Sequence, residues 1–188
     1  VMPFVEQLAT ELRAQAYHRR MLNIEFDDRD IGGARGWDWI KKGIPIRIEI
    51  GPRDIAENSV FVGRRDRHYK EKVSINRDTF VAEITKTLDD IQATLFNRAV
   101  AFREANTENI GQRDLFYDYF TPKNLEKPEI HGGFAVSPWC GHEACELKIK
   151  EDLSVSIRCI PFDGGPARDA CICCGKPAAQ EVIFAKAY

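Results

Sequence analysis

Two short cysteine pairs near the end of the chain constrain its fold more than any other feature. They are Cys140-Gly-His-Glu-Ala-Cys145 and Cys171-Ile-Cys-Cys174. Cysteines spaced two to four residues apart can bind one metal ion, and two such pairs complete the tetrahedral shell of a structural zinc site. Four thiolates leave no open coordination position for a substrate. We therefore expect a zinc ion that supports the fold and takes no part in chemistry.

The surrounding residues sharpen this prediction and leave some alternatives open. Gly175 follows the second pair, and glycine readily takes the positive φ of a tight knuckle. Neighbouring side chains diverge, so we expect Cys173 to be a spare beside Cys174. Cys159 is expected to be a buried free thiol, and His142 could replace one cysteine as a ligand. A disulfide framework is the main competing interpretation, but the chain shows no signal peptide and is long enough to build a core.

The composition describes a globular protein of one or two domains with no transmembrane run, which we expect to be cytoplasmic. Of its 188 residues, 44% are hydrophobic and 30% are charged, and the formal net charge is −2. Such a balance excludes nucleic-acid binding by bulk charge alone, so any RNA contact must be local. The chain begins with Val1, so we expect it to be a piece of a longer protein. Turn-forming residues near 107–111 predict two domains, 1–108 and 109–188.

Hydrophobic periodicity predicts an α/β domain over residues 1–108, with a mixed sheet covered by helices. The predicted helices begin near Phe4, Gly36 and Asp78, and the predicted strands cover residues 22–26, 44–50, 60–62 and 72–75. Strand 44–50 alternates, which places Arg47 and Glu49 on one face and isoleucines on the other. Trp37 and Trp39 are expected to pack their helix against the domain.

The second domain is predicted to be a small α+β unit built around the cysteines. Strands are expected at residues 131–139, 155–161 and 181–185, with a helical turn at 146–152. Tyr188 follows the last strand by only three residues, so we expect it to be held in place.

Several of these segments resemble the C-terminal third of prolyl-tRNA synthetases of the archaeal and eukaryotic-like type. The similarity runs in one consistent order through residues 43–54, 63–66, 89–99, 140–145, 158–162, 174–177 and 184–188. It implies an anticodon-binding domain followed by a zinc-binding domain. The aminoacylating domain of that family, with its ATP, Mg²⁺ and proline sites, has no counterpart here, so this chain alone is expected to be inactive.

The resemblance also implies roles for individual residues. Family members read two anticodon guanines with a strand arginine, a basic residue after Gly-Pro, a downstream lysine and a glutamate. These positions correspond to Arg47, Arg53 and one of Lys70 or Lys72, whereas Ile40 stands in place of the glutamate. The remaining expected RNA contacts are Asp38, which could replace that glutamate, and Glu49, Arg64, Arg65 and Arg67. The resemblance further implies proline tRNA and the catalytic domain as partners, a homodimeric full-length enzyme, and a Tyr188 carboxylate near the catalytic centre.

Simpler interpretations compete with these roles. Charge on an exposed strand often serves only solvation and protection from edge pairing. Asp66 and Glu71 also dilute the basic run between Arg64 and Lys72. Two other function classes therefore stay open: a stand-alone RNA-binding accessory protein, and a zinc-stabilised protein-interaction module.

Overall fold

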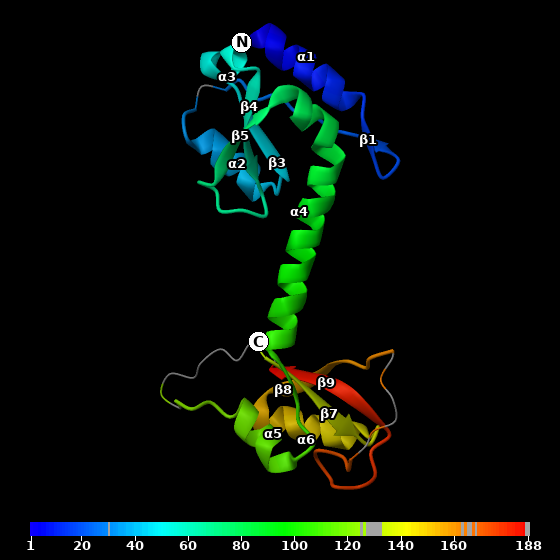
Figure 1. Ribbon diagram of the computed structural model, residues 1–188. Coiled ribbons are helices and arrows are strands. Elements are labelled where there is room, and N and C mark those ends of the chain that lie inside the picture. The colour runs from blue at the N-terminus through cyan, green and yellow to red at the C-terminus, as the bar shows by residue number, and fades with distance from the viewer. Residues whose placement is uncertain are drawn as a thin grey trace. The chain divides into compact units, whose positions relative to one another are not determined.

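The chain folds into two compact units, Val1–Ala99 and Val100–Tyr188 (Figure 1). The computed structural model describes residues 1–29, 31–124, 126, 133–162, 164, 167 and 169–186. Each unit has its own hydrophobic core, and the two cores share no residue. The predicted domain boundary after residue 108 falls inside a short strand, β6 (Thr107–Asn109), whereas the compact units meet within a helix. The division into domains 1–108 and 109–188 therefore stays a prediction.

The first unit contains a three-stranded antiparallel sheet of order β3-β4-β5. A separate two-stranded hairpin, β1-β2, precedes it. The elements of this unit are α1 (Met2–Arg13), β1 (Ala16–Tyr17), β2 (Arg20–Met21), α2 (Ala34–Lys41), β3 (Ile46–Glu49), α3 (Pro52–Ala56), β4 (Ser59–Arg64), β5 (Lys72–Asn76) and the part of α4 (Arg77–Ala105) that ends at Ala99.

One face of this sheet is covered, and the other carries Arg47, Glu49 and Lys72. Leu8 and Leu12 of α1 and Phe80 and Ile84 of α4 pack against Val60 and neighbouring apolar residues of the sheet. The period-2 alternation of β3 and β4 directs these apolar side chains inward, which leaves the intervening positions on the opposite face. The α/β class is confirmed, and the charged face is free of the two covering helices.

Three details of the first unit differ from the sequence-based expectation. Residues 22–26 are not a strand: Leu22 and Ile24 alternate because they pack on the core, without a strand partner among the described residues. The sheet is antiparallel throughout its described strands, and the mixed sheet belongs to the second unit. Helix α3 was not predicted; Pro52 begins it, and the Asp54 carboxylate accepts a hydrogen bond from the Gly51 N–H at 2.8 Å.

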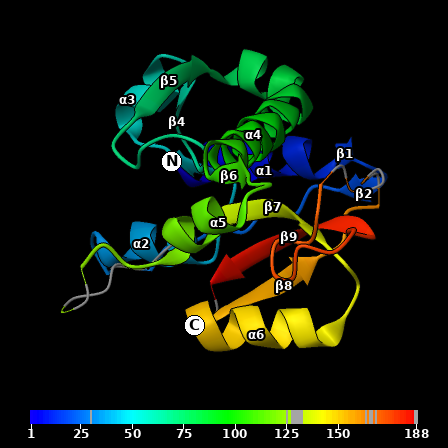
Figure 2. The same ribbon diagram turned by 90° about the horizontal axis from the view of Figure 1, so that it is seen from below.

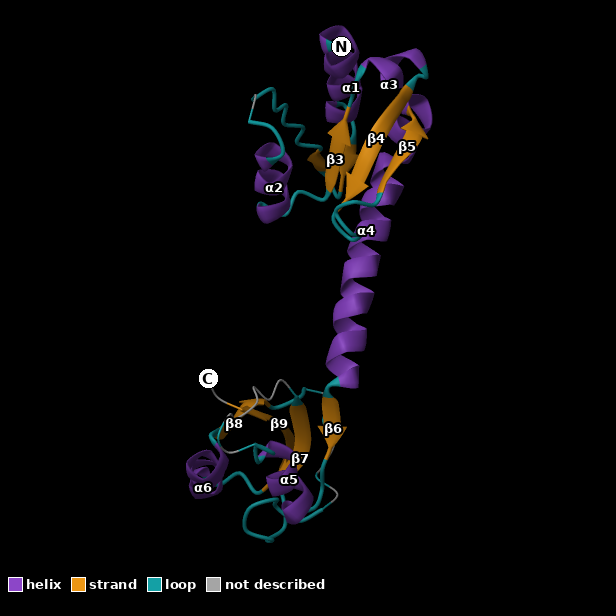
Figure 3. Cartoon of the chain, turned by 90° about the vertical axis from the view of Figure 1, so that its left-hand side faces the viewer, coloured by secondary structure: helices purple, strands orange, loops and turns teal. Residues whose placement is uncertain are grey.

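The second unit is a four-stranded mixed sheet of order β6-β7-β9-β8, with β6 parallel to β7 and the other pairs antiparallel (Figure 3). Strand β9 (Gln180–Lys186) therefore lies in the interior of the sheet, although it is the last strand in the chain. Helix α6 (Glu143–Leu153) runs beside β8 (Val155–Cys159), as Figure 2 shows. The remaining elements are α5 (Arg113–Phe120) and β7 (Phe134–Trp139).

Helix α5 completes the core of the second unit. Phe116 and Phe120 lie one helical turn apart and are fully buried. The Phe116 ring meets the rings of Phe120 and Phe184 edge to face, with centroids 5.0 and 5.1 Å apart. Helix α5 was not predicted, because its eight residues are too few to show clear periodicity.

Candidate nucleic-acid interface and metal centre

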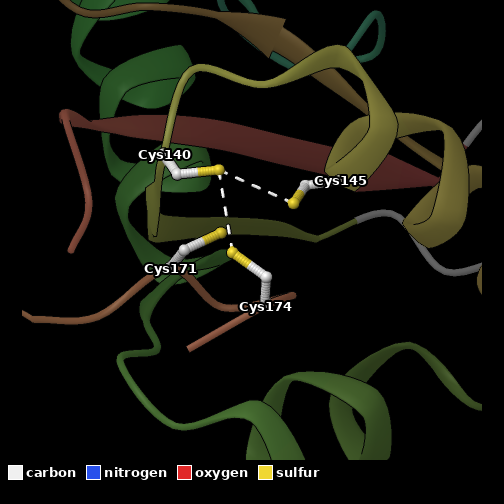
Figure 4. A group of neighbouring side chains, drawn as sticks. All are labelled: Cys140, Cys145, Cys171 and Cys174. Carbon is white, nitrogen blue, oxygen red and sulfur yellow. Dashed lines mark hydrogen bonds between the residues drawn. The ribbon is translucent and has the colours of Figure 1, made fainter. Parts of the chain in front are cut away.

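The structure brings the four predicted metal ligands together in the second unit. The sulfur atoms of Cys140, Cys145, Cys171 and Cys174 all lie within 4.8 Å of one another. Figure 4 shows them turned toward a common centre, the first pair from the end of β7 and the start of α6, the second pair from a later loop. The ligand set therefore joins two segments that are distant in the sequence.

The spacing of the sulfurs fits a metal ion and excludes disulfides. The Cys140 sulfur lies 3.6 Å from that of Cys145 and 3.9 Å from that of Cys174. A tetrahedral shell with metal–sulfur bonds of about 2.3 Å has sulfurs about 3.8 Å apart, whereas a disulfide bond measures about 2.05 Å. All six cysteines are free thiols. The four-cysteine cluster can therefore hold one metal ion that prefers thiolate ligands.

The local backbone prepares this cluster. Gly175 has φ +70°, which confirms the predicted knuckle, and its N–H donates to the Cys171 carbonyl at 2.9 Å. Gly141 takes φ +84° beside the first pair. Cys145 lies in the first turn of α6, which begins at Glu143 and brings its sulfur to 3.6 Å from that of Cys140. Both cysteine pairs are thus held by turns that glycine or a helix start makes possible.

The thiols differ in their readiness to ionise. Burial of the Cys171 thiol opposes ionisation, but hydrogen bonds from the backbone N–H groups of Cys174, Cys173 and Cys140 lower its pKa to about 7. Burial and the neighbouring thiols raise the pKa of Cys145, and burial raises that of Cys140. A bound cation would remove this difference, because a coordinated thiol is deprotonated.

The two cysteines outside the cluster have different surroundings. Cys173 is buried and is absent from the four-sulfur group, in line with its prediction as the spare. The expectation that Cys159 is a buried thiol was wrong, because its side chain is exposed. Strand β8 is at the edge of the sheet, and its register shifts between Ile157 and Cys159. This irregularity releases Cys159 from the alternation that would have placed it inside.

The open face of the first sheet carries the predicted RNA-contacting residues of β3 and β5. Arg47, Gly63 and Lys72 lie opposite one another across the three strands, and Glu49 and Phe61 form the next row on the same face. A Cβ atom at Gly63 would lie 3.1 Å from a guanidinium nitrogen of Arg47. The missing side chain of Gly63 therefore makes room for Arg47 to extend across β4.

The charged side chains on and near this face differ in whether they already have partners. Lys72 forms an ion pair with Glu49, and Arg53, on α3, donates to Glu57 at 3.0 Å. The Lys70 ammonium lies 5.6 Å from the centre of the Tyr69 ring. Among the described residues, the half-buried Arg47 has no hydrogen-bond or ion-pair partner. Its guanidinium is thus available to a ligand without the loss of an existing bond.

A small cavity of about 50 Å³ adjoins Arg47. Its lining combines four arginines with an aromatic ring and two isoleucines: Arg47, Arg64, Arg65, Arg67, Tyr69, Ile40 and Ile44. We call this group the arginine pocket. Three predicted contact residues, Arg64, Arg65 and Arg67, therefore lie beside the strand arginine. Asp66 and Asp90 balance part of this positive charge through Arg64, and the remainder favours an anion.

Asp66, which is completely buried, fixes the geometry of the arginine pocket. Arg64 donates two hydrogen bonds to the Asp66 carboxylate, at 2.9 and 2.7 Å, and also pairs with Asp90. These bonds from Arg64 hold the pKa of Asp66 below its usual range despite burial. Arg98 donates to the Asp66 carbonyl at 2.7 Å. Asp66 was expected only to dilute the charge of the basic run, but its carboxylate holds Arg64 of that run in place.

The helix α2 positions differ from the pattern that the resemblance implies. Ile40 lines the arginine pocket, so an apolar side chain stands where a glutamate was expected. The Asp38 carboxylate lies 3.3 Å from an Arg29 nitrogen and already has a partner. Tyr188, predicted to point toward a catalytic centre, lies outside the described residues.

Two residues of this surface were missed by sequence reasoning. Tyr69 contributes a ring to the pocket, and Gly63 contributes space. Gly63 could be identified only from the pairing register of β3 and β4, which the sequence does not give. Tyr69 lies in a turn, where hydrophobic periodicity carries no information.

Two known protein families match the chain. Residues 1–87 match the family described as "Anticodon binding domain" and residues 126–188 match the family described as "Prolyl-tRNA synthetase, C-terminal". The first match covers the arginine pocket, and the second covers all four clustered cysteines.

Whole-chain comparison finds similar curated proteins in several organisms. The sequence is 44% identical over its full length to "Proline--tRNA ligase 2" of Anaeromyxobacter dehalogenans, 41% to "Proline--tRNA ligase" of Protochlamydia amoebophila and 42% to that of Bdellovibrio bacteriovorus. These relatives are bacterial, so they do not establish the archaeal and eukaryotic-like type. The chain spans 37–38% of their lengths. Within the described part of the chain, every helix is too short or too polar to cross a lipid bilayer.

Proposed function

The chain belongs to the prolyl-tRNA synthetase family, and we propose that its first unit reads the anticodon of proline tRNA as the C-terminal part of a longer ligase. The observation that carries this proposal is the guanidinium of Arg47, which has no partner among the described residues, on an open sheet face beside the arginine pocket. Anticodon bases are single-stranded and are read on their edges by side chains. A planar guanidinium can offer a guanine edge two hydrogen bonds.

The contacts divide into base reading and backbone binding. Arg47 engages a guanine edge, and Arg53 a second one after exchange of its exposed Glu57 partner. Lys70 and Lys72 follow as basic contacts on the same side of the sheet. The remaining predicted residues, Asp38, Glu49, Arg64, Arg65 and Arg67, orient these groups or contact phosphates.

The metal of the second unit is zinc in this proposal, held by Cys140, Cys145, Cys171 and Cys174. Sulfur-only coordination at tetrahedral spacing suits zinc, which has no geometric preference from its d electrons and does not undergo redox change. Since four thiolates fill the shell, the ion supports the fold. The residues of this chain supply the ligands, and the ion supplies cross-linking energy.

The proposal extends to a whole protein that contains this chain. Such a protein would attach proline to its tRNA with ATP and Mg²⁺ bound in a separate catalytic domain, as a cytoplasmic homodimer. This chain alone would bind tRNA without aminoacylating it. The carboxylate of Tyr188 would reach toward that catalytic domain, a role tested by deleting Tyr188 in the whole protein and measuring proline activation and zinc content.

Binding of two alanine variants tests the anticodon assignment. Arg47→Ala and Arg53→Ala are each expected to weaken binding of proline tRNA by about 1–3 kcal/mol, because a bidentate base contact is lost. A tRNA with the anticodon guanines replaced should bind the wild-type chain and both variants equally weakly. Filter binding or fluorescence anisotropy at fixed salt measures these constants. Equal losses on both RNAs would show that these arginines contact only the backbone.

A further inference from the structure

Two exposed aromatic side chains, Trp37 and Tyr69, contact each other at the rim of the arginine pocket. Trp37 comes from α2 and Tyr69 from the turn between β4 and β5, and their ring centroids lie 5.0 Å apart at an interplanar angle of 43°. Their exposed fractions are 47% and 40%. Neither belongs to the hydrophobic core of the first unit. We call this pair the aromatic pair.

The expectation that Trp37 packs its helix against the domain was wrong, because its side chain is exposed. Trp39 is half-buried, and its indole N–H donates to the Asp27 carboxylate at 2.6 Å. Trp37, two positions away, instead presents nearly half of its surface to solvent beside another exposed ring. Removing large aromatic surface from water is favourable. A flat ligand that covers this exposed pair of rings is therefore bound more tightly.

The surroundings of the aromatic pair are basic. The Lys70 ammonium lies 5.6 Å from the Tyr69 ring centroid, and the His68 ring lies 4.5 Å from the same ring. Tyr69 also lines the arginine pocket together with Arg47 and three further arginines. Tyr69 thus belongs both to the aromatic pair and to the arginine pocket, so flat rings lie next to a group of cations. This combination is typical of proteins that bind single-stranded nucleic acid.

The dimensions of the arginine pocket decide which part of a nucleotide it takes. Its volume of about 50 Å³ is well below the roughly 300–1,000 Å³ of pockets that enclose a whole small molecule. It is too small to enclose a nucleobase but can receive phosphate oxygens. A base whose phosphate is held there must lie outside the pocket, where the aromatic pair is exposed.

We propose that Trp37 and Tyr69 form a stacking platform for one unpaired nucleobase of the bound RNA, whose phosphate is held by the arginine pocket. This inference rests on the proposed function, because it names how the same surface holds a nucleotide next to the one read by Arg47. Stacking is tolerant of base identity, since every base has a flat π face. The platform therefore supplies affinity, and Arg47 supplies selectivity.

Substitution of Trp37 gives the direct test. The whole chain is titrated with the anticodon stem-loop of proline tRNA, and binding is followed by fluorescence anisotropy. Loss of one stacked base weakens single-strand binding by about 5- to 150-fold, and Trp37→Leu is expected to fall in this range. Trp37→Phe retains a ring and should stay within about threefold of wild type. Phe102→Leu, which removes a ring that is 70% exposed in the second unit, serves as the matched control and should leave binding unchanged.

Abasic substitution in the RNA identifies the stacked base. Each loop nucleotide is replaced in turn by an abasic residue that keeps its phosphate. At one position, the abasic RNA is expected to bind wild type and Trp37→Leu equally, because the partner of Trp37 is already missing. The intrinsic fluorescence of Trp37 should also be quenched by the intact stem-loop, and that part of the quenching should be absent in Trp37→Phe.

These measurements separate the inference from the function on which it rests. If wild type does not distinguish the proline anticodon from the replaced one, the anticodon-reading proposal fails. If wild type distinguishes them but Trp37→Leu binds like wild type, with its metal content and thermal unfolding unchanged, the stacking platform is refuted. Equal effects of Trp37→Leu on every abasic RNA would likewise refute it, because the residue would then act through the fold alone.

Discussion

At the scale of single residues, the absence of a side chain is as important as the charged groups. Arg47 extends across β4 because its cross-strand neighbour is Gly63, where a Cβ would lie 3.1 Å from the guanidinium. Gly175 similarly allows the second cysteine pair to turn, at φ +70°. In both cases glycine positions a neighbouring functional group. Gly63 does so by leaving room for the guanidinium, and Gly175 by adopting a backbone conformation that favours glycine.

Adjacent cysteines provide a residue-scale prediction. Cys174→Ser is expected to lose the metal, because its sulfur belongs to the cluster, whereas Cys173→Ser should retain one equivalent. Both variants remove one thiol from the same loop, so each is the matched control for the other. Metal analysis of freshly purified, reduced protein measures the outcome. Retention by Cys174→Ser together with loss by Cys173→Ser would reverse the ligand assignment.

At the scale of elements, the turn between β4 and β5 organises the proposed RNA-binding surface around a buried carboxylate. Asp66 accepts two hydrogen bonds from Arg64, lies 3.6 Å from an Arg67 nitrogen, and is followed three residues later by Tyr69. The turn thereby connects the arginine pocket to the aromatic pair. A change at Asp66 should alter stability and RNA binding together.

Asp66→Asn is expected to destabilise the first unit by about 3 kcal/mol, because it breaks a buried ion pair. Asp90→Asn, at an exposed partner of the same Arg64, should cost less than about 1 kcal/mol. Since Arg64 lowers the pKa of Asp66, the folded state binds fewer protons than the unfolded state in acid. The free energy of unfolding should therefore fall as the pH drops below about 4, the pKa of an unfolded aspartate.

Urea unfolding of wild type and both variants between pH 3 and 7 measures this contribution. Asp66→Asn should show a shallower loss of stability in acid than wild type, and Asp90→Asn should follow wild type. A wild-type acid dependence that persists unchanged in Asp66→Asn would assign the effect to other carboxylates.

Local signals predicted most elements, and the exceptions depend on tertiary contacts. Helices α1, α2 and α4 and strands β3, β4 and β5 follow from apolar periodicity, and the four-cysteine cluster follows from cysteine spacing. Residues 22–26 alternate for packing alone, and Cys159 escapes its alternation through a register shift. The arginine pocket depends on the register of β3 against β4 and on the contact of the following turn with α2. These are long-range properties that no local pattern contains.

At the scale of the whole molecule, each unit has a core of its own and a different means of stabilisation. The first core includes residues of α1, β4 and α4, whereas the second includes Cys145, Cys171 and Cys173 beside its apolar residues. A metal ion held by the four-cysteine cluster would therefore be coupled directly to the packing of the second unit.

Removal of the metal is accordingly expected to affect one unit. Treatment of the whole chain with a strong chelator under reducing conditions should accelerate amide exchange in α6, β8 and the second cysteine loop. Exchange in β3, β4 and β5 should change by less than about twofold, because the first core contains no metal ligand. Hydrogen exchange followed by mass spectrometry makes the comparison, with re-added zinc as the control. Equal acceleration in both units would show that the metal stabilises the chain as a whole.

The interior position of β9 has a consequence for how the second unit is made by the ribosome. Strand β7 pairs with β9 along its whole length, yet 52 positions separate Phe134 from Lys186, the last residue of β9. At about 5–20 residues per second, translation of that stretch takes roughly 3–10 seconds. During this time one edge of β7 is unpaired. Cys140 and Cys145 also lack the other two residues of the cluster until Cys171 and Cys174 have been made. The nascent chain is therefore most vulnerable to aggregation and thiol oxidation within this interval. A reducing compartment would prevent the oxidation, and nearby chaperones would prevent the aggregation.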